Sequence, residues 1–295
     1  MSPLDRHRKA VTVAVFVTFL WSSSWILIKW GLDTLPPLTF GGLRYFLGFL
    51  CLLPFALRYQ RAAPREALTR REWLELLGYG LLFYTVTQGA QFMALVYLPA
   101  AGLSLLLNLS PLVIAVLGFL LLKEHLVRSH VMALILSMSG VLLYFDFGAL
   151  NTEAWTGIFL GMLCLLANAL SAVSGRAINR RGRHPAALIT LISMGAGSFS
   201  LLVAGIVLEP WPALGWTELA LIGWLAVVNT ALAFVLWNRA LAELSATEAG
   251  LINNAMLPQI AILAWMFLGE RLEAIQILAI ALMVIALIVL QRQRH

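Results

Sequence analysis

Residues 99–122 read PAAGLSLLLNLSPLVIAVLGFLLL, a run without a charged side chain. An α-helix rises about 1.5 Å per residue, so about 20 apolar residues cross the roughly 30 Å hydrocarbon core of a bilayer. The run is therefore long enough to span a membrane. It contains Pro111, which removes a backbone donor and bends a helix at that point.

The same pattern returns in the second half of the chain. The residues that correspond are Ala101-Gly102-Leu103 with Ala249-Gly250-Leu251, Pro111 with Pro258, and Leu122-Lys123-Glu124 with Leu268-Gly269-Glu270. Pro258 follows Pro111 by 147 residues, half the length of this 295-residue chain. We therefore predict two repeats, residues 1–148 and 149–295.

Composition indicates that lipid is the solvent for much of the protein surface. Hydrophobic residues make up 61% and charged residues 12%, whereas soluble domains carry about 45–50% and about 25%. Apolar runs of membrane-spanning length are predicted at 10–30, 37–58, 73–96, 99–122, 129–147, 155–178, 186–208, 215–238, 245–268 and 272–291. The predicted fold class is an all-α integral membrane protein with ten transmembrane helices.

The number of spans in each repeat has a geometric consequence. With five spans in the first repeat, the second must enter the membrane from the opposite side. Inverted repeats of this kind place a binding site where they meet, near the middle of the bilayer, and rocking of one repeat against the other gives alternating access. Duplicated halves that form only a stable scaffold are the alternative.

The distribution of basic residues predicts the orientation. The segments on the side of the N-terminus hold 17 of the 20 lysines and arginines, the opposite side holds Lys29 and Arg271, and Arg44 lies within the second span. Short cytoplasmic loops are enriched in lysine and arginine. We therefore expect a multi-pass protein of the cell inner (plasma) membrane with both termini in the cytoplasm.

Three groups of motifs occur along the chain: Leu236-Trp237-Asn238-Arg239-Ala240-Leu241 with Ser245-Ala246-Thr247-Glu248-Ala249, Pro258 and Leu268-Gly269-Glu270-Arg271-Leu272; Leu20-Trp21-Ser22 with Pro36-Pro37-Leu38 and Arg44; and Pro111 with Leu122-Lys123-Glu124. Together they resemble the EamA-type branch of the drug/metabolite transporter superfamily. Lys123 stands where the family usually has glycine. The resemblance covers essentially the whole chain. It implies a central cavity lined by helices 1–4 and 6–9, with helices 5 and 10 more peripheral, and export or uptake of small metabolites such as amino acids.

Polar residues within the spans are candidates for lining that cavity. Polar groups are costly in hydrocarbon unless they face a cavity or a partner, and many of these recur at the three- and four-residue spacing of one helix face. The predicted substrate-binding residues are Trp21, Ser24, Tyr84, Gln88, Gln91, Asn108, Asn168, Ser171, Trp237 and Asn254. The alternative is that they form hydrogen bonds between helices and hold the bundle together.

Three further residues are predicted to act in gating or in structure: Arg44, Pro111 and Pro258. Arg44 lies about 10 Å along the second span, given the helical rise. It could extend to the interface, bind exposed carbonyls, or attract an anionic group such as a substrate carboxylate. The two prolines could be packing kinks or hinges. Glu124 and Glu270 are expected to form interfacial ion pairs beside Lys123 and Arg271.

These patterns favour a secondary transporter, either an exporter or a facilitator, for a small metabolite such as an amino acid or an amphiphilic compound. The alternative is a non-transporting membrane receptor or a structural membrane protein. No nucleophile–base set, His/Cys metal cluster or phosphate loop is present in the sequence, so we predict no catalytic residues, no metal and no cofactor. The expected partners are a small-molecule substrate and the lipid bilayer, without nucleic acid, for a monomer or homodimer. No aspartate, glutamate or histidine falls in the middle of a span, which favours a facilitator or exchanger, or coupling by a peripheral group.

Overall fold

The computed structural model describes residues 3–61, 68–122, 128–145, 150–244 and 246–292, and this part of the chain is helical and contains no strand. The elements in chain order are α1 (Pro3–Gly31), α2 (Pro37–Arg61), α3 (Arg70–Gly80), η1 (Leu81–Thr87), α4 (Gln88–Tyr97), α5 (Ala100–Leu107), α6 (Ser110–Leu122), α7 (Arg128–Tyr144), α8 (Thr152–Arg180), α9 (Ala186–Leu208), α10 (Trp216–Ala226), η2 (Val227–Leu232), α11 (Ala233–Leu241), α12 (Ala246–Asn254), α13 (Met256–Leu268) and α14 (Ala274–Arg292). The elements η1 and η2 are π-helical.

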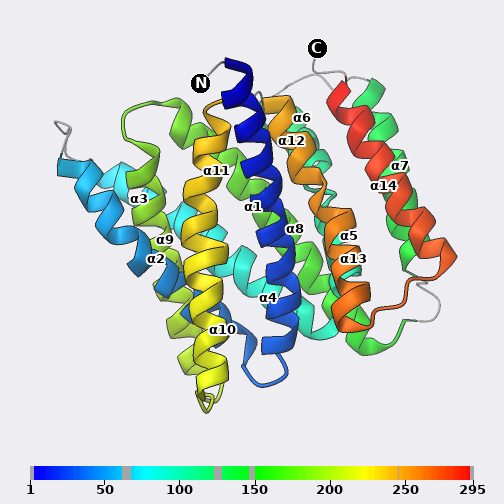
Figure 1. Cartoon of the computed structure of the whole chain (residues 1–295), viewed down its shortest axis with the longest axis horizontal. Coiled ribbons are helices and arrows are strands. Elements are labelled where there is room, and N and C mark those ends of the chain that lie inside the picture. The colour runs from blue at the N-terminus through cyan, green and yellow to red at the C-terminus, as the bar shows by residue number, and fades with distance from the viewer. Residues whose placement is uncertain (1–2, 62–67, 123–127, 146–149, 245, 293–295) are drawn as a thin grey trace.

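In the described residues, seven helical stretches are long and apolar enough to cross a membrane. They are Asp5–Gly31, Pro37–Pro54, Ala100–Leu117, Thr152–Arg180, Leu188–Leu208, Trp216–Leu241 and Glu248–Leu268, and two shorter apolar helices are Met132–Tyr144 and Ala274–Ile288. However, α1 begins and α14 ends on the same side of the bundle (Figure 1). Ends on one side of a membrane require an even number of crossings, so at least one more stretch must cross. The count of ten stays a prediction.

The helices pack in pairs that join the two halves of the sequence. The most extensive contacts are between α2 and α9, between α7 and α14, and between α4 and α8, while α1 packs against α11 and α13. Helices α7 and α14 lie together at one edge of the bundle (Figure 1). They coincide with the fifth and tenth predicted spans, which the family resemblance implies are peripheral.

Helices α3 and α9 also pack against each other, and their contact depends on glycine. A Cβ atom added to Gly80 would lie 2.2 Å from the carbonyl oxygen of Ser193 on α9, and one added to Gly197 would lie 2.1 Å from the carbonyl oxygen of Gly80. The hydroxyl of Thr85 donates to the Gly197 carbonyl across the same contact, at 2.8 Å. Only a residue without a side chain lets α3 and α9 approach so closely.

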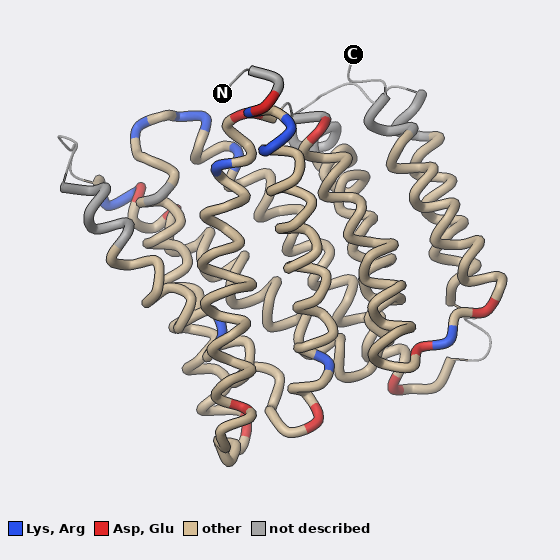
Figure 2. Tube along the Cα trace, in the orientation of Figure 1, with Lys and Arg blue, Asp and Glu red and all other residues tan. Residues whose placement is uncertain are grey.

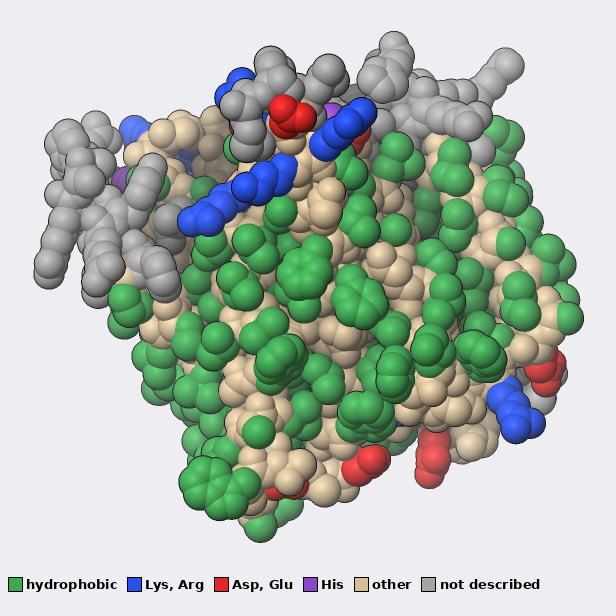
Figure 3. Space-filling model, in the orientation of Figure 1, with side chains coloured by type: hydrophobic (Ala, Val, Ile, Leu, Met, Phe, Trp, Pro, Cys, Tyr) green, Lys and Arg blue, Asp and Glu red, His purple; other side chains and the backbone are tan. Residues whose placement is uncertain are grey.

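The outer surface of the bundle is largely apolar. Figure 3 shows hydrophobic side chains over the central part of the visible face, with charges at its two ends. Large side chains such as Leu208, Phe159 and Trp265 are 72%, 69% and 61% exposed. Exposed apolar patches of this extent are uncommon on soluble monomers. Lipid is the solvent that this surface fits.

Two helices are interrupted close to the predicted prolines. Helix α5 ends at Leu107 and α6 begins at Ser110, one residue before Pro111. Helix α12 ends at Asn254 and α13 begins at Met256, two residues before Pro258. A proline lacks the N–H that would bond the preceding turn, so each interruption leaves carbonyl groups without their helical partner. The breaks are in equivalent places of the two halves.

Candidate functional site

A buried arginine lies among polar and aromatic side chains in the interior of the bundle. Arg44 of α2 is only 4% exposed. Its Nε–H donates to the hydroxyl of Thr230 in η2 at 3.2 Å, and its guanidinium lies 5.1 Å from the centroid of the Tyr45 ring. Of the roles considered for Arg44, extension to the membrane interface is therefore not the one that the structure shows.

The arginine is linked to helices of the first half through its neighbour in the chain. The hydroxyl of Tyr45 donates to Oε1 of Gln88 on α4 at 2.6 Å. The ring of Tyr84 in η1 meets the Tyr45 ring edge to face, with 5.8 Å between centroids. We call Arg44, Tyr45, Tyr84, Gln88 and Thr230 the Arg44 cluster, and all five are buried. The cluster joins α2, η1 and α4 of the first half to η2 of the second.

The two π-helical segments are in matching positions of the two repeats. Segment η1 begins at Leu81 and η2 at Val227, 146 residues later. In each, a threonine hydroxyl bonds the carbonyl five residues earlier: Thr87 to Leu82 and Thr230 to Leu225, both at 2.9 Å. Each hydroxyl therefore bonds a backbone carbonyl within or next to the π-helical turn. Short π-helical turns occur frequently at functional sites.

A second polar group connects α1 to the second half. The hydroxyl of Ser22 donates to Oε1 of Gln259 on α13 at 2.9 Å, and Nε2 of Gln259 lies 3.4 Å from the hydroxyl of Thr18. In η2, Nδ2 of Asn229 donates to the carbonyl of Leu20. Oδ1 of Asn229 is buried and has no hydrogen-bond partner within the described residues. An unpaired buried acceptor is rare in folded proteins.

The predicted site residues on the broken helix and on α8 lie near the Pro111 break. Nδ2 of Asn168 donates to the hydroxyl of Ser110 at 3.1 Å, which joins α8 to α6. Asn108, in contrast, donates to the carbonyl of Ser104 in its own helix at 2.7 Å. Ser171 is buried, and its hydroxyl has no partner in the described part of the chain.

The remaining predicted residues are placed as follows. The rings of Trp21 and Trp237 contact each other at 5.1 Å between centroids, which joins α1 to α11. Ser24 is buried and donates to the carbonyl of Trp21 at 2.6 Å. Gln91 and Asn254 are half-buried on α4 and α12. Thus the structure brings Tyr84 and Gln88 together with Arg44, and it places the other predicted residues in separate contacts.

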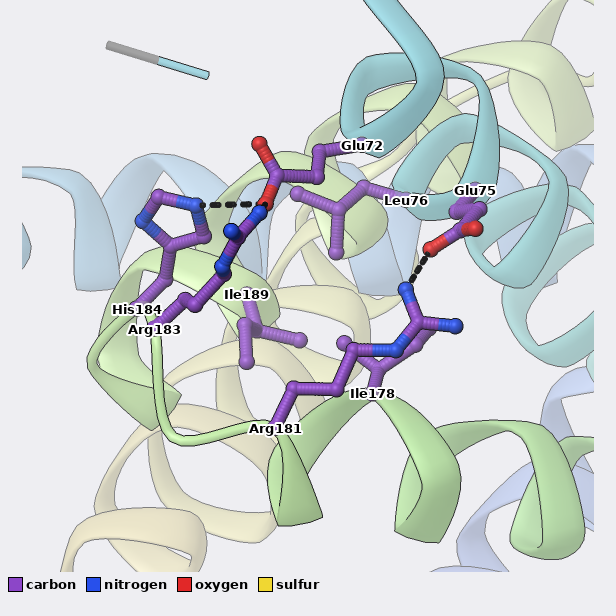
Figure 4. Close-up of a pocket in the computed structure, with 8 residues that line it drawn as sticks. All are labelled: Glu72, Glu75, Leu76, Ile178, Arg181, Arg183, His184 and Ile189. Carbon is purple, nitrogen blue, oxygen red and sulfur yellow. Dashed lines mark hydrogen bonds and ion pairs between the residues drawn. The ribbon is translucent and has the colours of Figure 1, made fainter. Parts of the chain in front are cut away.

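A group of charged residues connects the halves at the end of the bundle where α1 begins. Figure 4 shows Glu72 and Glu75 of α3 facing Arg181, Arg183 and His184 of the α8–α9 connection. Arg181 pairs with Glu75, while Arg183 Nη1 and His184 Nε2 lie 3.1 Å and 3.4 Å from Glu72 Oε1. The space they enclose is about 20 Å³, room for about one water molecule. This network can fasten the helices but cannot hold a metabolite.

The pKa of Glu72 is lowered within this network. The backbone N–H of Thr69 donates to the carboxylate at 2.9 Å and its hydroxyl at 2.8 Å, in a capping box that begins α3. These bonds, together with the Arg183 guanidinium, lower the pKa of Glu72 to about 2. The carboxylate is therefore ionised at any physiological pH and available for its ion pairs.

At the opposite end, a carboxylate of the second half caps a helix of the first. Glu209, just after α9, accepts the backbone N–H groups of Leu38 and Thr39 at 2.9 Å and 2.8 Å, and the Thr39 hydroxyl at 2.9 Å. These N–H groups belong to the first turn of α2, where a helix has unpaired donors and a positive dipole end.

Glu270 makes an equivalent contact. Its two oxygens accept the N–H groups of Ala100 and Ala101, at 2.7 Å and 3.2 Å, at the start of α5. This corrects the expectation that Glu270 pairs with the neighbouring Arg271: free helix N–H groups attract the carboxylate instead. The corresponding prediction for Glu124 and Lys123 lies outside the described residues.

Charge is distributed unevenly between the two ends. Figure 2 shows the lysines and arginines gathered mainly at the end where α1 begins, and acidic residues prevailing at the other. The described residues contain no group of three or more His, Cys, Asp or Glu side chains that could hold a metal ion. With its apolar surface and its buried polar contacts between halves, the chain is a multi-pass membrane protein of helical bundle architecture.

Comparison with known proteins defines the family. The model of the EamA-like transporter family matches residues 8–145 and again residues 155–292. The chain belongs to this family. The double match agrees with the internal duplication that the sequence predicts.

The relatives are transporters by name. The chain is 28% identical to "Uncharacterized transporter YoaV" of Bacillus subtilis (strain 168), over 90% of each protein. It is 26% identical to "Probable amino-acid metabolite efflux pump" of Escherichia coli (strain K12), over 95% of this chain and 94% of the relative. It is also 26% identical to "S-adenosylmethionine/S-adenosylhomocysteine transporter" of Chlamydia muridarum, over 92% and 90%. A solved crystal structure matches with a TM-score of 0.67 at 20% identity, covering 95% of this chain and 97% of the other, a likeness of fold alone.

The predicted substrate-binding residues do not include several residues that make contacts between helices. Tyr45 and Thr230 complete the Arg44 cluster, and Gln259 and Ser22 join α13 to α1. The available signal was their polarity within apolar runs, which is weak for a single threonine or tyrosine. Gln259 carried the stronger signal because an amide has several donors and acceptors to satisfy.

Proposed function

We propose that this protein is a secondary transporter, an exporter or facilitator, that moves a small metabolite across the membrane by alternating access. The observation that carries the proposal is the Arg44 cluster. A buried cation and four polar or aromatic side chains come from both halves of the chain, and π-helical turns lie at matching places on each side. A bundle that served only as a scaffold would gain more stability from apolar packing there.

The proposal includes the topology. Residues 1–148 and 149–295 form two five-helix repeats of opposite orientation, which gives ten crossings. The protein lies in the cell inner (plasma) membrane, with both termini in the cytoplasm. The gathering of basic residues at the end where α1 begins supports that orientation. In this arrangement the ion pair of Glu72 with Arg183 holds the two halves together on the cytoplasmic side. The helix caps made by Glu209 and Glu270 hold the two halves together on the external side.

Alternating access then has a physical basis in these contacts. These two sets of contacts between the halves are at opposite ends of the bundle, and the Arg44 cluster is buried between them. Breaking the contacts at one end while those at the other stay intact exposes the cluster to one side of the membrane at a time. The breaks at Pro111 and Pro258 supply places where helices can bend during this exchange.

The substrate class follows from the relatives and from the side chains. Relatives named for amino-acid metabolites and for S-adenosylmethionine support an amino acid or another small amphiphilic solute. The Trp21–Trp237 pair offers a planar surface, and Gln88 and Asn168 offer amide groups. The sequence has no mid-span acid or imidazole, so we propose facilitated transport or exchange without proton coupling.

Flux into proteoliposomes tests the proposal. Purified protein in liposomes preloaded with an unlabelled mixture of amino acids should exchange radiolabelled amino acids from outside, with saturation. Gln88→Leu should reduce this exchange, whereas Ser137→Ala on the peripheral α7 should leave it unchanged. A saturable interaction without flux would support the receptor alternative instead, and turnover of the solute would indicate an enzyme.

A further inference from the structure

Arg44 is a buried cation without an anionic partner in the described residues. Ion pairs in that part of the chain lie at the end of the bundle where α1 begins: His7 with Glu248, Arg71 and Arg181 with Glu75, and Arg183 and His184 with Glu72. The side chains with which Arg44 makes a hydrogen bond or a cation–π contact, those of Thr230 and Tyr45, are neutral. A charge is expensive to bury without compensation. An anion that binds to Arg44 would therefore offset the free-energy cost of burying its charge.

The guanidinium also has N–H donors that make no hydrogen bond to the described residues. It carries five N–H groups, and Nε–H to Thr230 is the one with a partner among the described residues. Its planar fork matches a carboxylate in two parallel hydrogen bonds. Close by, Gln88 accepts the Tyr45 hydroxyl on Oε1, so its amide N–H₂ group can serve as a further donor to the same anion.

The charge count favours a monoanion. Lys29 is a cation inside the bundle, but its Nζ donates to the backbone carbonyls of Leu95 and Leu98 at the end of α4. One cation surrounded by neutral groups balances a single negative charge. A phosphate dianion would bring a second charge that these side chains do not compensate. A carboxylate is the common metabolite group that fits.

We propose that the transported solute carries a carboxylate that binds Arg44 directly. This inference rests on the proposed transport function and narrows its substrate to monocarboxylates, amino acids included. Alternate opening of the two ends brings the carboxylate to the arginine from one side and releases it to the other. Arg44 is then a substrate-binding residue and not a structural one.

Ligand binding to the wild-type protein gives the first test, because it needs no variant. Thermal melting of purified protein is followed with the standard L-amino acids and short monocarboxylates, and for those that stabilise, with the matching carboxamide and the decarboxylated amine. We expect at least one carboxylate to bind, and its amide and amine to bind about 10- to 100-fold more weakly, as for loss of a charged hydrogen bond. If no carboxylate stabilises the protein, or the amide binds equally well, the proposal fails.

Substitution of the arginine gives the second test. Arg44→Met should abolish stabilisation by the carboxylate while the melting temperature without ligand stays equal or rises. Thr230 keeps its bond to the Leu225 carbonyl, and Tyr45 keeps its bond to Gln88, so the substitution strands no buried group. A fall in the melting temperature without ligand would mean a structural role and would overturn the proposal. Arg239→Met, on the exposed end of α11, is the matched control and should retain carboxylate binding.

The two proposals can fail separately. Carboxylate binding that depends on Arg44, without flux in proteoliposomes, refutes transport and leaves the binding site standing. The carboxylate-binding role of Arg44 is refuted, and transport is retained, by a different result. In that result flux is saturable, but its rate is the same for a carboxylate and its amide or amine, and the same for wild type and Arg44→Met.

Discussion

The contact between Glu209 and the start of α2 allows a quantitative prediction. The carboxylate accepts three hydrogen bonds, from the N–H groups of Leu38 and Thr39 and from the Thr39 hydroxyl. Glu209→Ala removes both acceptor oxygens, and with them all three hydrogen bonds, together with the favourable charge at the positive end of the helix. We expect the protein to lose stability while the bundle remains folded.

The magnitude follows from the number and the setting of these bonds. A hydrogen bond to a charged group contributes about 1.5–3 kcal/mol, and a side-chain cap about 0.5–2 kcal/mol. Glu209 is partly exposed, and water replaces some of what is lost, so the three bonds together should contribute about 2–3 kcal/mol. With about 2–4 °C per kcal/mol in chains of about 150–250 residues, the melting temperature should fall by about 4–12 °C.

Thermal unfolding of purified protein in detergent, followed by intrinsic fluorescence, measures this change. Thr39→Val removes one of the three bonds and should give a smaller fall than Glu209→Ala. Glu243→Ala is the control because Glu243 is exposed on the α11–α12 connection. Equal melting temperatures for Glu209→Ala, Glu243→Ala and the wild type would refute the capping argument.

Two further predictions concern α3. Gly80→Ala should lower the melting temperature strongly because its Cβ would lie 2.2 Å from the Ser193 carbonyl oxygen, whereas Gly78→Ala, with open space around it, should be neutral or stabilising; similar melting curves for the two variants would contradict the close contact. The lowered pKa of Glu72, caused mainly by the Thr69 backbone N–H, makes its stabilising effect complete above about pH 4.5 and lost as the pH falls towards about 2. The melting-temperature difference between wild type and Glu72→Gln should therefore be constant at neutral pH and shrink between about pH 4.5 and about pH 2. A difference that does not change with pH would contradict the lowered pKa of Glu72.

Much of the architecture could be predicted from the sequence because it depends on local patterns. The repeat of Pro111 and Pro258 marks two helices that the structure interrupts at equivalent positions. The spacing of Tyr84 and Gln88 places them on one face of a helix, and both are in the Arg44 cluster. Length and apolar content predict ten spans from the sequence, and the described residues contain seven helical stretches that are long and apolar enough to cross a membrane.

The contacts between helices could not be predicted in the same way. Thr230 as the partner of Arg44 depends on how α2 meets η2, a tertiary contact 186 residues apart in the chain. The π-helical turns depend on one extra residue per turn, which leaves no pattern in side-chain polarity. Ser24 and Asn108 have the polarity of cavity residues, yet each bonds a carbonyl of its own helix. Their part in substrate binding stays a prediction.

Access of water-soluble reagents to the Arg44 cluster tests the central claim most directly. Cys51 and Cys164 are free thiols and are replaced first, after which Thr230→Cys and Ser137→Cys are made singly and inserted in sealed vesicles of each orientation. A membrane-impermeant thiol reagent should modify Cys at position 230 from either side, at rates that a bound carboxylate lowers, and should not reach position 137. Modification from neither side or from one side only, or rates that no solute changes, would contradict a transport path through this cluster.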